Sequence, residues 1–174
     1  DEGTTAEKLA ELHRRLEQAQ DPGSEKAKAR RDKAGLTTPR QRINALLDEG
    51  TFVEIGALGR TPGEEDAPYG DGVVTGYGTI DGRRVCVFSQ DGEIFDGTMG
   101  EVYAEKLTKI YDLAIKTGVP VIGIYESTGP RVQEGIVTMA GYARLMARVS
   151  QASGLIPQIS VIAGNTSGIA AFAP

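Results

Sequence analysis

The chain has 174 residues and a formal net charge of −5, a length that suits one domain with a sizeable core. The negative charge argues against general binding to nucleic acid. A single cysteine, Cys86, excludes an internal disulfide, and no metal-ligand cluster has usable spacing. Without a signal peptide or an apolar run long enough to span a bilayer, we expect a cytoplasmic protein with no membrane partner.

Capping signals predict helices near the start of the chain. Thr4 and Glu7 form a capping box before a helix from Thr5 to about Gln20. Its narrow leucine stripe cannot form a core alone, so we expect it to pack on a neighbour or another subunit. Thr38 and Gln41 form a second box before a short helix. The basic stretch between them, 26–33, is either a landing surface for phosphates or an acidic partner, or a solvated helix or linker, and its spacing alone favours the latter.

The middle of the chain predicts a hairpin followed by a helix. Gly72 to Ile80 and Arg84 to Gln90 flank Asp81-Gly82, the signature of a type I′ turn. The next helix runs from about Thr98 or Gly100 to Lys116. A further helix from about Val137 to Gln151 is expected to bury Met139, Tyr142, Leu145, Met146 and Val149.

Two similar units combine an apolar strand, a turn of small residues and a helix. The first strand is Val119 to Ile124, with its turn at Glu126 to Arg131. The second strand is Gln158 to Ala163, with its turn at Gly164 to Ala171. Such turns direct backbone N–H groups into a small space, which is how an oxyanion is stabilised. The units supply two donors to one site, or one donor pair to each of two sites.

Several motifs in this order resemble one family. They are Gly97-Thr98-Met99-Gly100-Glu101, the stretches 127–135 and 152–160, the hairpin 71–84 and Arg42 to Asp48. Together they resemble the carboxyltransferase (β) subunits of biotin-dependent acyl-CoA carboxylases, the propionyl-CoA carboxylase type. The resemblance implies an α/β crotonase-type (ClpP/crotonase) fold of repeated ββα units. Residues 1–50 would be an N-terminal helical extension, and 51–174 the N-terminal half of the carboxyltransferase, incomplete at its C-terminus.

The resemblance also implies site residues. Thr128 and Gly129 correspond to the family's first oxyanion pair, which is linked to the acyl-CoA carbonyl, and Gly168 and Ile169 correspond to a second glycine pair. Phe95, Gly97 and Thr98 lie in a turn that approaches the pantetheine and adenine of coenzyme A. Arg131 either binds phosphate or pairs structurally with Glu134 or Asp112. Thr128, Pro130 and Ile169 depart from the family pattern and imply an altered pocket.

The function implied is transfer of CO2 from carboxybiotin to the α-carbon of a short acyl-CoA through an enolate. The implied cofactor is biotin on a carrier protein, and the implied partners are the biotin carboxylase and carrier subunit and further copies of the chain, six in the family. The residues 1–174 alone are expected to be inactive. Two alternatives stay open: a diverged decarboxylase or tailoring carboxyltransferase acting on a malonyl-type CoA, and a non-catalytic acyl-CoA-binding or assembly subunit.

Overall fold

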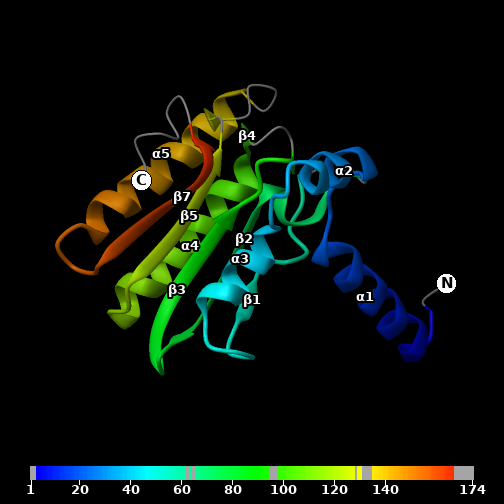
Figure 1. The fold of residues 1–174 in the computed structure, drawn as a ribbon, viewed down its shortest axis with the longest axis horizontal. Helices are drawn as coiled ribbons and strands as arrows, with labels where there is room; N and C mark the ends of the chain where they lie inside the picture. Colours follow the sequence, from blue (N-terminus) through cyan, green and yellow to red (C-terminus); the bar gives the residue numbers. More distant parts are fainter. Residues whose placement is uncertain are drawn as a thin grey trace.

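The centre of the molecule is a mixed five-stranded sheet (Figure 1). The computed structural model describes residues 3–61, 63, 66–94, 98–127, 129–130 and 135–166. Within these ranges the strand order is β1-β2-β3-β5-β7, where the strands are Val53–Ile55, Val73–Ile80, Arg83–Gln90, Val121–Ser127 and Gln158–Thr166. β1, β2 and β3 pair antiparallel, and β3, β5 and β7 are parallel. The predicted α/β class is therefore confirmed.

The first helices begin at their expected caps. Thr4 and Glu7 bond reciprocally at the start of α1 (Thr5–Gln20), and Thr38 and Gln41 do the same at the start of α3 (Pro39–Leu46). The basic stretch forms a further helix, α2 (Glu25–Lys33), so it is not a linker. α1 points away from the sheet (Figure 1), and its leucines remain exposed.

The predicted hairpin joins β2 to β3. Asp81 and Gly82 have φ values of 50° and 74°, the left-handed conformation that a type I′ turn requires at both positions. Asp48 stabilises this turn, because its carboxylate accepts hydrogen bonds from the amides of both turn residues at 2.9 Å. The pKa of Asp48 is lowered, first by the Thr79 hydroxyl and then by these amides.

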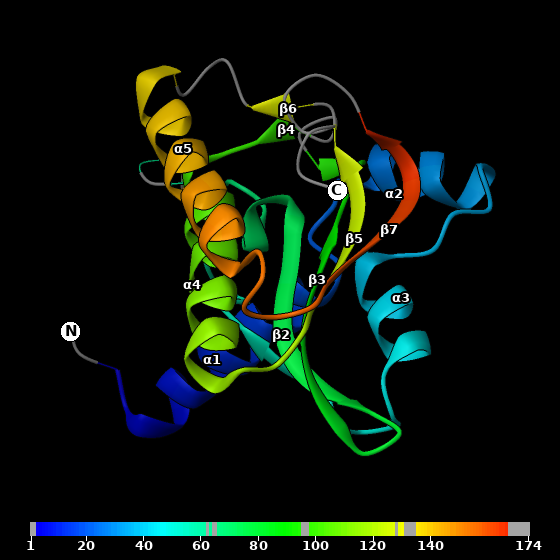
Figure 2. The same cartoon turned by 90° about the vertical axis from the view of Figure 1, so that its left-hand side faces the viewer.

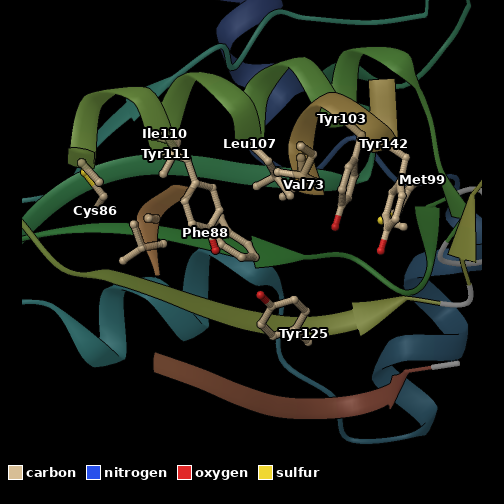
Figure 3. Close-up of a cluster of buried hydrophobic side chains, with 14 of the residues drawn as sticks. Val73, Cys86, Phe88, Met99, Tyr103, Leu107, Ile110, Tyr111, Tyr125 and Tyr142 are labelled. Carbon is tan, nitrogen blue, oxygen red and sulfur yellow. The ribbon is translucent and has the colours of Figure 1, made fainter. Parts of the chain in front are cut away.

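Two helices cover one face of the sheet. α4 (Glu101–Thr117) connects β3 to β5, and α5 (Gly135–Ala152) connects β5 to β7 (Figure 2). Their apolar side chains meet the sheet in the main core, where the rings of Phe88 and Tyr125 lie edge to face with centroids 5.3 Å apart (Figure 3). Tyr142 and Leu145 are buried as expected, but the expectation for Met139 was wrong, since it is 49% exposed. Met139 lies in the first turns of α5, where the described residues leave about half of it uncovered.

The opposite face of the sheet is covered by α3. Ile43 and Leu47 pack with Val87 and Ile122 in a second apolar cluster. The covering ends before β7, which is the last strand of the sheet in the described ranges. Most residues of β7 are exposed, whichever face of the sheet they lie on. They include Ile159, Val161 and Ile162. The two layers of helix therefore enclose β2, β3 and β5, but not β7.

Candidate functional site

The candidate site lies where the parallel strands end. β3, β5 and β7 finish at Gln90, Ser127 and Thr166, and because the strands are parallel these ends share one edge of the sheet. Ser127 lies opposite Thr166 after an irregularity in the pairing that begins at Tyr125. Figure 2 shows the ends of β5 and β7 close to the short strands β4 (Thr98–Met99) and β6 (Gly129–Pro130).

The structure brings two predicted site residues together. Thr98 lies opposite Gly129 in the parallel β4–β6 pair, directly before the N-terminus of α4. β4, which follows β3, and β6, which follows β5, are therefore neighbours, although 30 residues of chain lie between Thr98 and Gly129. Thr128, Arg131, Gly168 and Ile169, with Phe95 and Gly97, lie outside the described residues, so their roles remain predictions. Asp112, one structural partner considered for Arg131, pairs with Arg148 at 2.6 Å.

Gln90 connects the three elements around the site and was missed by the sequence analysis. Its side chain is 2% exposed. Its Oε1 accepts a hydrogen bond from the Glu126 amide at 2.7 Å, and its Nε2 donates to the Tyr103 hydroxyl on α4. A polar residue that ends an apolar strand was the available signal. Gln90 thus joins the ends of β3 and β5 to the first turn of α4.

A buried ion pair lies beside Gln90. The Arg42 guanidinium on α3 is 2.8 Å from the Glu126 carboxylate, and the two side chains are only 11% and 13% exposed. Arg42 also donates to the Gln90 carbonyl at 3.3 Å. Arg42 had appeared only as part of a family motif and Glu126 only as a turn residue. Their contact places a fixed pair of charges beneath the strand ends.

Two glycines make room for the Glu126 side chain. A Cβ added to Gly92, in the turn after β3, would lie 2.6 Å from the Glu126 side chain. A Cβ added to Gly164, near the end of β7, would lie 2.7 Å from it. Both distances are shorter than real contacts allow, so each position needs glycine for close approach rather than for an unusual φ. Glu126 therefore fills the space between two neighbouring strand ends.

A second set of contacts holds the N-terminus of α4. Asp71 accepts a hydrogen bond from the Tyr103 amide at 2.9 Å. Lys106, also on α4, donates to the Gly70 carbonyl at 3.1 Å and to the Val73 carbonyl. Burial lowers the pKa of Lys106 to about 8. These contacts fix α4 to residues 70–73 at the start of β2, so the helix end beside Thr98 has a defined position.

Neither the cysteine nor the histidine of the chain is placed to act at the strand ends. Cys86 is buried in β3, and burial raises the pKa of its thiol to about 11. His13 is exposed on α1, far along the chain from the strand ends. Within the described ranges no group of His, Cys, Asp and Glu could hold a metal ion.

The basic helix α2 is largely engaged in structural pairs. Arg31 is buried and pairs with Asp21 at 2.9 Å, and Arg30 pairs with Glu93 at 2.9 Å. Lys26 and Lys33 are exposed. The interpretation of 26–33 as a helix with a solvated face is thus the one its contacts favour. No helix among the described residues is long and apolar enough to cross a membrane.

Comparisons with known proteins agree with this geometry. Residues 30–174 match the model of the carboxyl transferase domain. The chain is 52% identical over 176 residues to the propionyl-CoA carboxylase beta chain of Saccharopolyspora erythraea, covering 98% of this chain and 32% of that protein. It is also 52% identical, over 171 residues, to the biotin-dependent long chain acyl-coenzyme A carboxylase beta4 subunit of Mycobacterium tuberculosis, covering 98% and 33%.

A solved structure shares the fold over nearly the whole chain. It is a transcarboxylase 12S hexamer with methylmalonyl-coenzyme A and methylmalonic acid bound, which superposes with a TM-score of 0.92 at 34% identity. The match covers 99% of this chain and 35% of that one. The crotonase-like fold predicted from the sequence is therefore confirmed. The chain spans about a third of the length of these relatives.

Proposed function

Because the chain belongs to the carboxyl transferase domain family, we propose that the protein transfers CO2 from carboxybiotin to the α-carbon of a short-chain acyl-CoA. The observation that carries this proposal is the 52% identity to a propionyl-CoA carboxylase beta chain along 98% of this chain. The β4–β6 pairing agrees with it, since it places Gly129 beside the turn that leads into α4. We take a propionyl-CoA-like thioester as the substrate, after the relative named a propionyl-CoA carboxylase beta chain.

The chemistry requires negative charge to be held on the thioester oxygen. Removal of the α-proton gives an enolate, and fixed N–H donors lower its energy by about 3 kcal/mol each. We assign the amides of Thr128 and Gly129 to this oxygen. Gly168 and Ile169 supply either a further pair to the same oxygen or a pair to another one. Carboxybiotin would supply the carboxyl group, and the biotin released would take up the α-proton. In the family the donors to carboxybiotin lie in the C-terminal half.

The coenzyme A portion would lie along the turn that precedes α4. We assign Phe95, Gly97 and Thr98 to its pantetheine and adenine, and Arg131 to a phosphate or to a structural pair. Partners follow from the chemistry: a biotin-carrying protein, the biotin carboxylase that loads it, and further copies of this chain. The cytoplasm is the proposed location.

The test uses the full-length protein with a biotinylated carrier and its carboxylase. Acetyl-, propionyl- and butyryl-CoA are offered with ATP and labelled bicarbonate, and carboxylated CoA products are identified by mass spectrometry. We expect the product from propionyl-CoA to form fastest. If no thioester is carboxylated, the proposal fails. Release of CO2 from methylmalonyl-CoA without biotin would establish the decarboxylase instead, and acyl-CoA binding without either reaction would establish a non-catalytic subunit.

A further inference from the structure

The end of β5 carries a carboxylate that the oxyanion chemistry does not use. Side chains alternate along a strand, so Glu126 points to the face of the sheet that α3 covers, together with Ile122 and Ile124. Its carboxylate meets Arg42 at 2.8 Å, and its side-chain carbons fill the space between Gly92 and Gly164. One side chain on β5 therefore contacts both neighbouring strand ends.

The guanidinium of Arg42 is held on several sides. Its Nε donates to the Thr37 hydroxyl at 3.2 Å, and its Nη2 donates to the Thr37 carbonyl at 3.0 Å. Its Nη1 donates to the Gln90 carbonyl at the end of β3. A planar guanidinium with this many fixed partners has little freedom. It therefore fixes the Glu126 carboxylate relative to both α3 and β3.

The main chain of Glu126 is fixed by the same neighbour. Gln90 Oε1 accepts a hydrogen bond from the Glu126 amide, while the Gln90 carbonyl accepts from Arg42. Gln90, Glu126 and Arg42 thus form a closed set of contacts one residue before Ser127. A buried ion pair adds little net stability compared with an apolar pair of similar shape, and its best-attested use is to fix one arrangement.

We propose that Glu126, held by Arg42, is a positioning residue that fixes the spacing of the ends of β3, β5 and β7, and hence of the turns that follow them. The carboxylate does not touch the reacting atoms. It acts through Gly92, Gly164 and the backbone at Gly129. The part of this proposal that concerns turnover rests on the proposed function, whereas the part that concerns the spacing of the strand ends does not.

The chain offers a matched control in a second ion pair on α3. Arg40 contacts Glu54 on β1 at 2.5 Å, and these side chains are 14% and 16% exposed. This pair resembles Arg42–Glu126 in burial and in its parent helix, but it contacts no strand end of the site. Comparison of Glu126→Gln with Glu54→Gln therefore separates loss of a buried ion pair from loss of positioning.

The first experiment measures carboxyl transfer by the full-length protein with its biotin-carrying partner. We expect Glu126→Gln to lower kcat by about a hundredfold, the effect of misplacing a site by about 1 Å, with little change in the KM for acyl-CoA. Glu126→Asp keeps the charge but loses the glycine contacts, and an intermediate kcat is expected. Glu54→Gln should leave kcat near that of the parent. Equal kcat in the two Gln variants would overturn the proposal.

The second experiment does not depend on turnover, so it separates this proposal from the proposed function. Hydrogen exchange is followed in peptides that contain Gly92, Gly129 and Thr166. In Glu126→Gln, exchange should accelerate about tenfold in all three peptides, and in Glu54→Gln in none of them. Arg42→Lys provides the same readout if Glu126→Gln does not fold. Unchanged exchange at the strand ends would refute the positioning role even in an inactive protein.

Discussion

Asp71 caps helix α4 from outside the helix, because its Oδ2 accepts a hydrogen bond from the Tyr103 amide at 2.9 Å. The residue at the N-cap itself, Gly100, has no side chain to serve this purpose. Asp71 is fully buried and has a φ of 51°, a conformation that aspartate and asparagine tolerate better than most residues. Asp71, in the segment before β2, therefore supplies an acceptor for the first turn of α4.

Replacement of this cap should destabilise the protein. We expect Asp71→Ala to lower the free energy of unfolding by about 2 kcal/mol, because a buried amide loses its acceptor. Asp71→Asn keeps an acceptor oxygen and should cost less. Denaturant unfolding measures both values, with Thr4→Ala at the exposed cap of α1 as the control. An Asp71→Ala variant as stable as the parent would show that the cap contributes nothing.

Lys106 should make stability depend on pH. Burial lowers its pKa to about 8 in the folded protein, below its ordinary value of 10.5. Between these values the unfolded chain binds more protons than the folded one, so stability rises with pH, by at most about 1.4 kcal/mol per pH unit. From about pH 8 upward, the unfolding free energy of the parent should therefore rise relative to that of Lys106→Met. A constant difference from neutral pH to about 9.5 would contradict this.

Substitutions at Gly164 and Glu126 should change the unfolding free energy in a strongly non-additive way. Gly164→Ala places a Cβ 2.7 Å from the Glu126 side chain, so we expect a loss of more than about 2 kcal/mol in unfolding free energy. In a Glu126→Ala background the clash is absent, and the same change should cost much less. Gly23→Ala is the control, because its added Cβ meets its nearest atom at 3.6 Å. Additive losses in the double variant would place the strain elsewhere.

Cys86 should resist thiol reagents in the folded protein. Burial raises its pKa to about 11, so only ~0.1% of the thiol is ionised at pH 8 and that fraction is shielded by the sheet. Labelling with iodoacetamide should be slow in buffer and complete in denaturant. Carboxyl transfer by the full-length protein should survive incubation with the reagent. Rapid labelling of the native protein would show that β3 opens readily.

Local signals in the sequence predicted the elements whose geometry is decided within a few residues. The Thr38–Gln41 box and the Asp81-Gly82 turn are of this kind, and both are confirmed. Met139 was assigned to the core from helical spacing alone. That spacing identifies a face of α5, but it does not say how far the neighbouring helix extends, and Met139 is exposed. Its environment depends on tertiary packing rather than on local pattern.

The contacts of Gln90 and Arg42 beside the candidate site could not be predicted, because their partners are distant in the chain. Gln90 bonds to a residue 36 positions away, and the Arg42 guanidinium reaches a carbonyl 48 positions away. Contacts at such separations along the chain leave no periodic or short-range pattern in the sequence. The Thr98–Gly129 pairing likewise arises only when two loops meet. The sequence pattern indicated the turns and the family resemblance implied the roles of their residues, whereas the contacts that hold the strands emerged only with the fold.

The uncovered strand β7 has a practical consequence for handling the polypeptide. Its apolar residues Ile159, Val161 and Ile162 are exposed to solvent. Among the described strands only β5 pairs with β7, so the backbone on its other edge has no described partner strand. An open edge of this composition is a template for intermolecular strand addition. A preparation limited to these residues should therefore form soluble aggregates or fibrils on concentration, and a charged substitution at Ile162 should delay their appearance in light scattering.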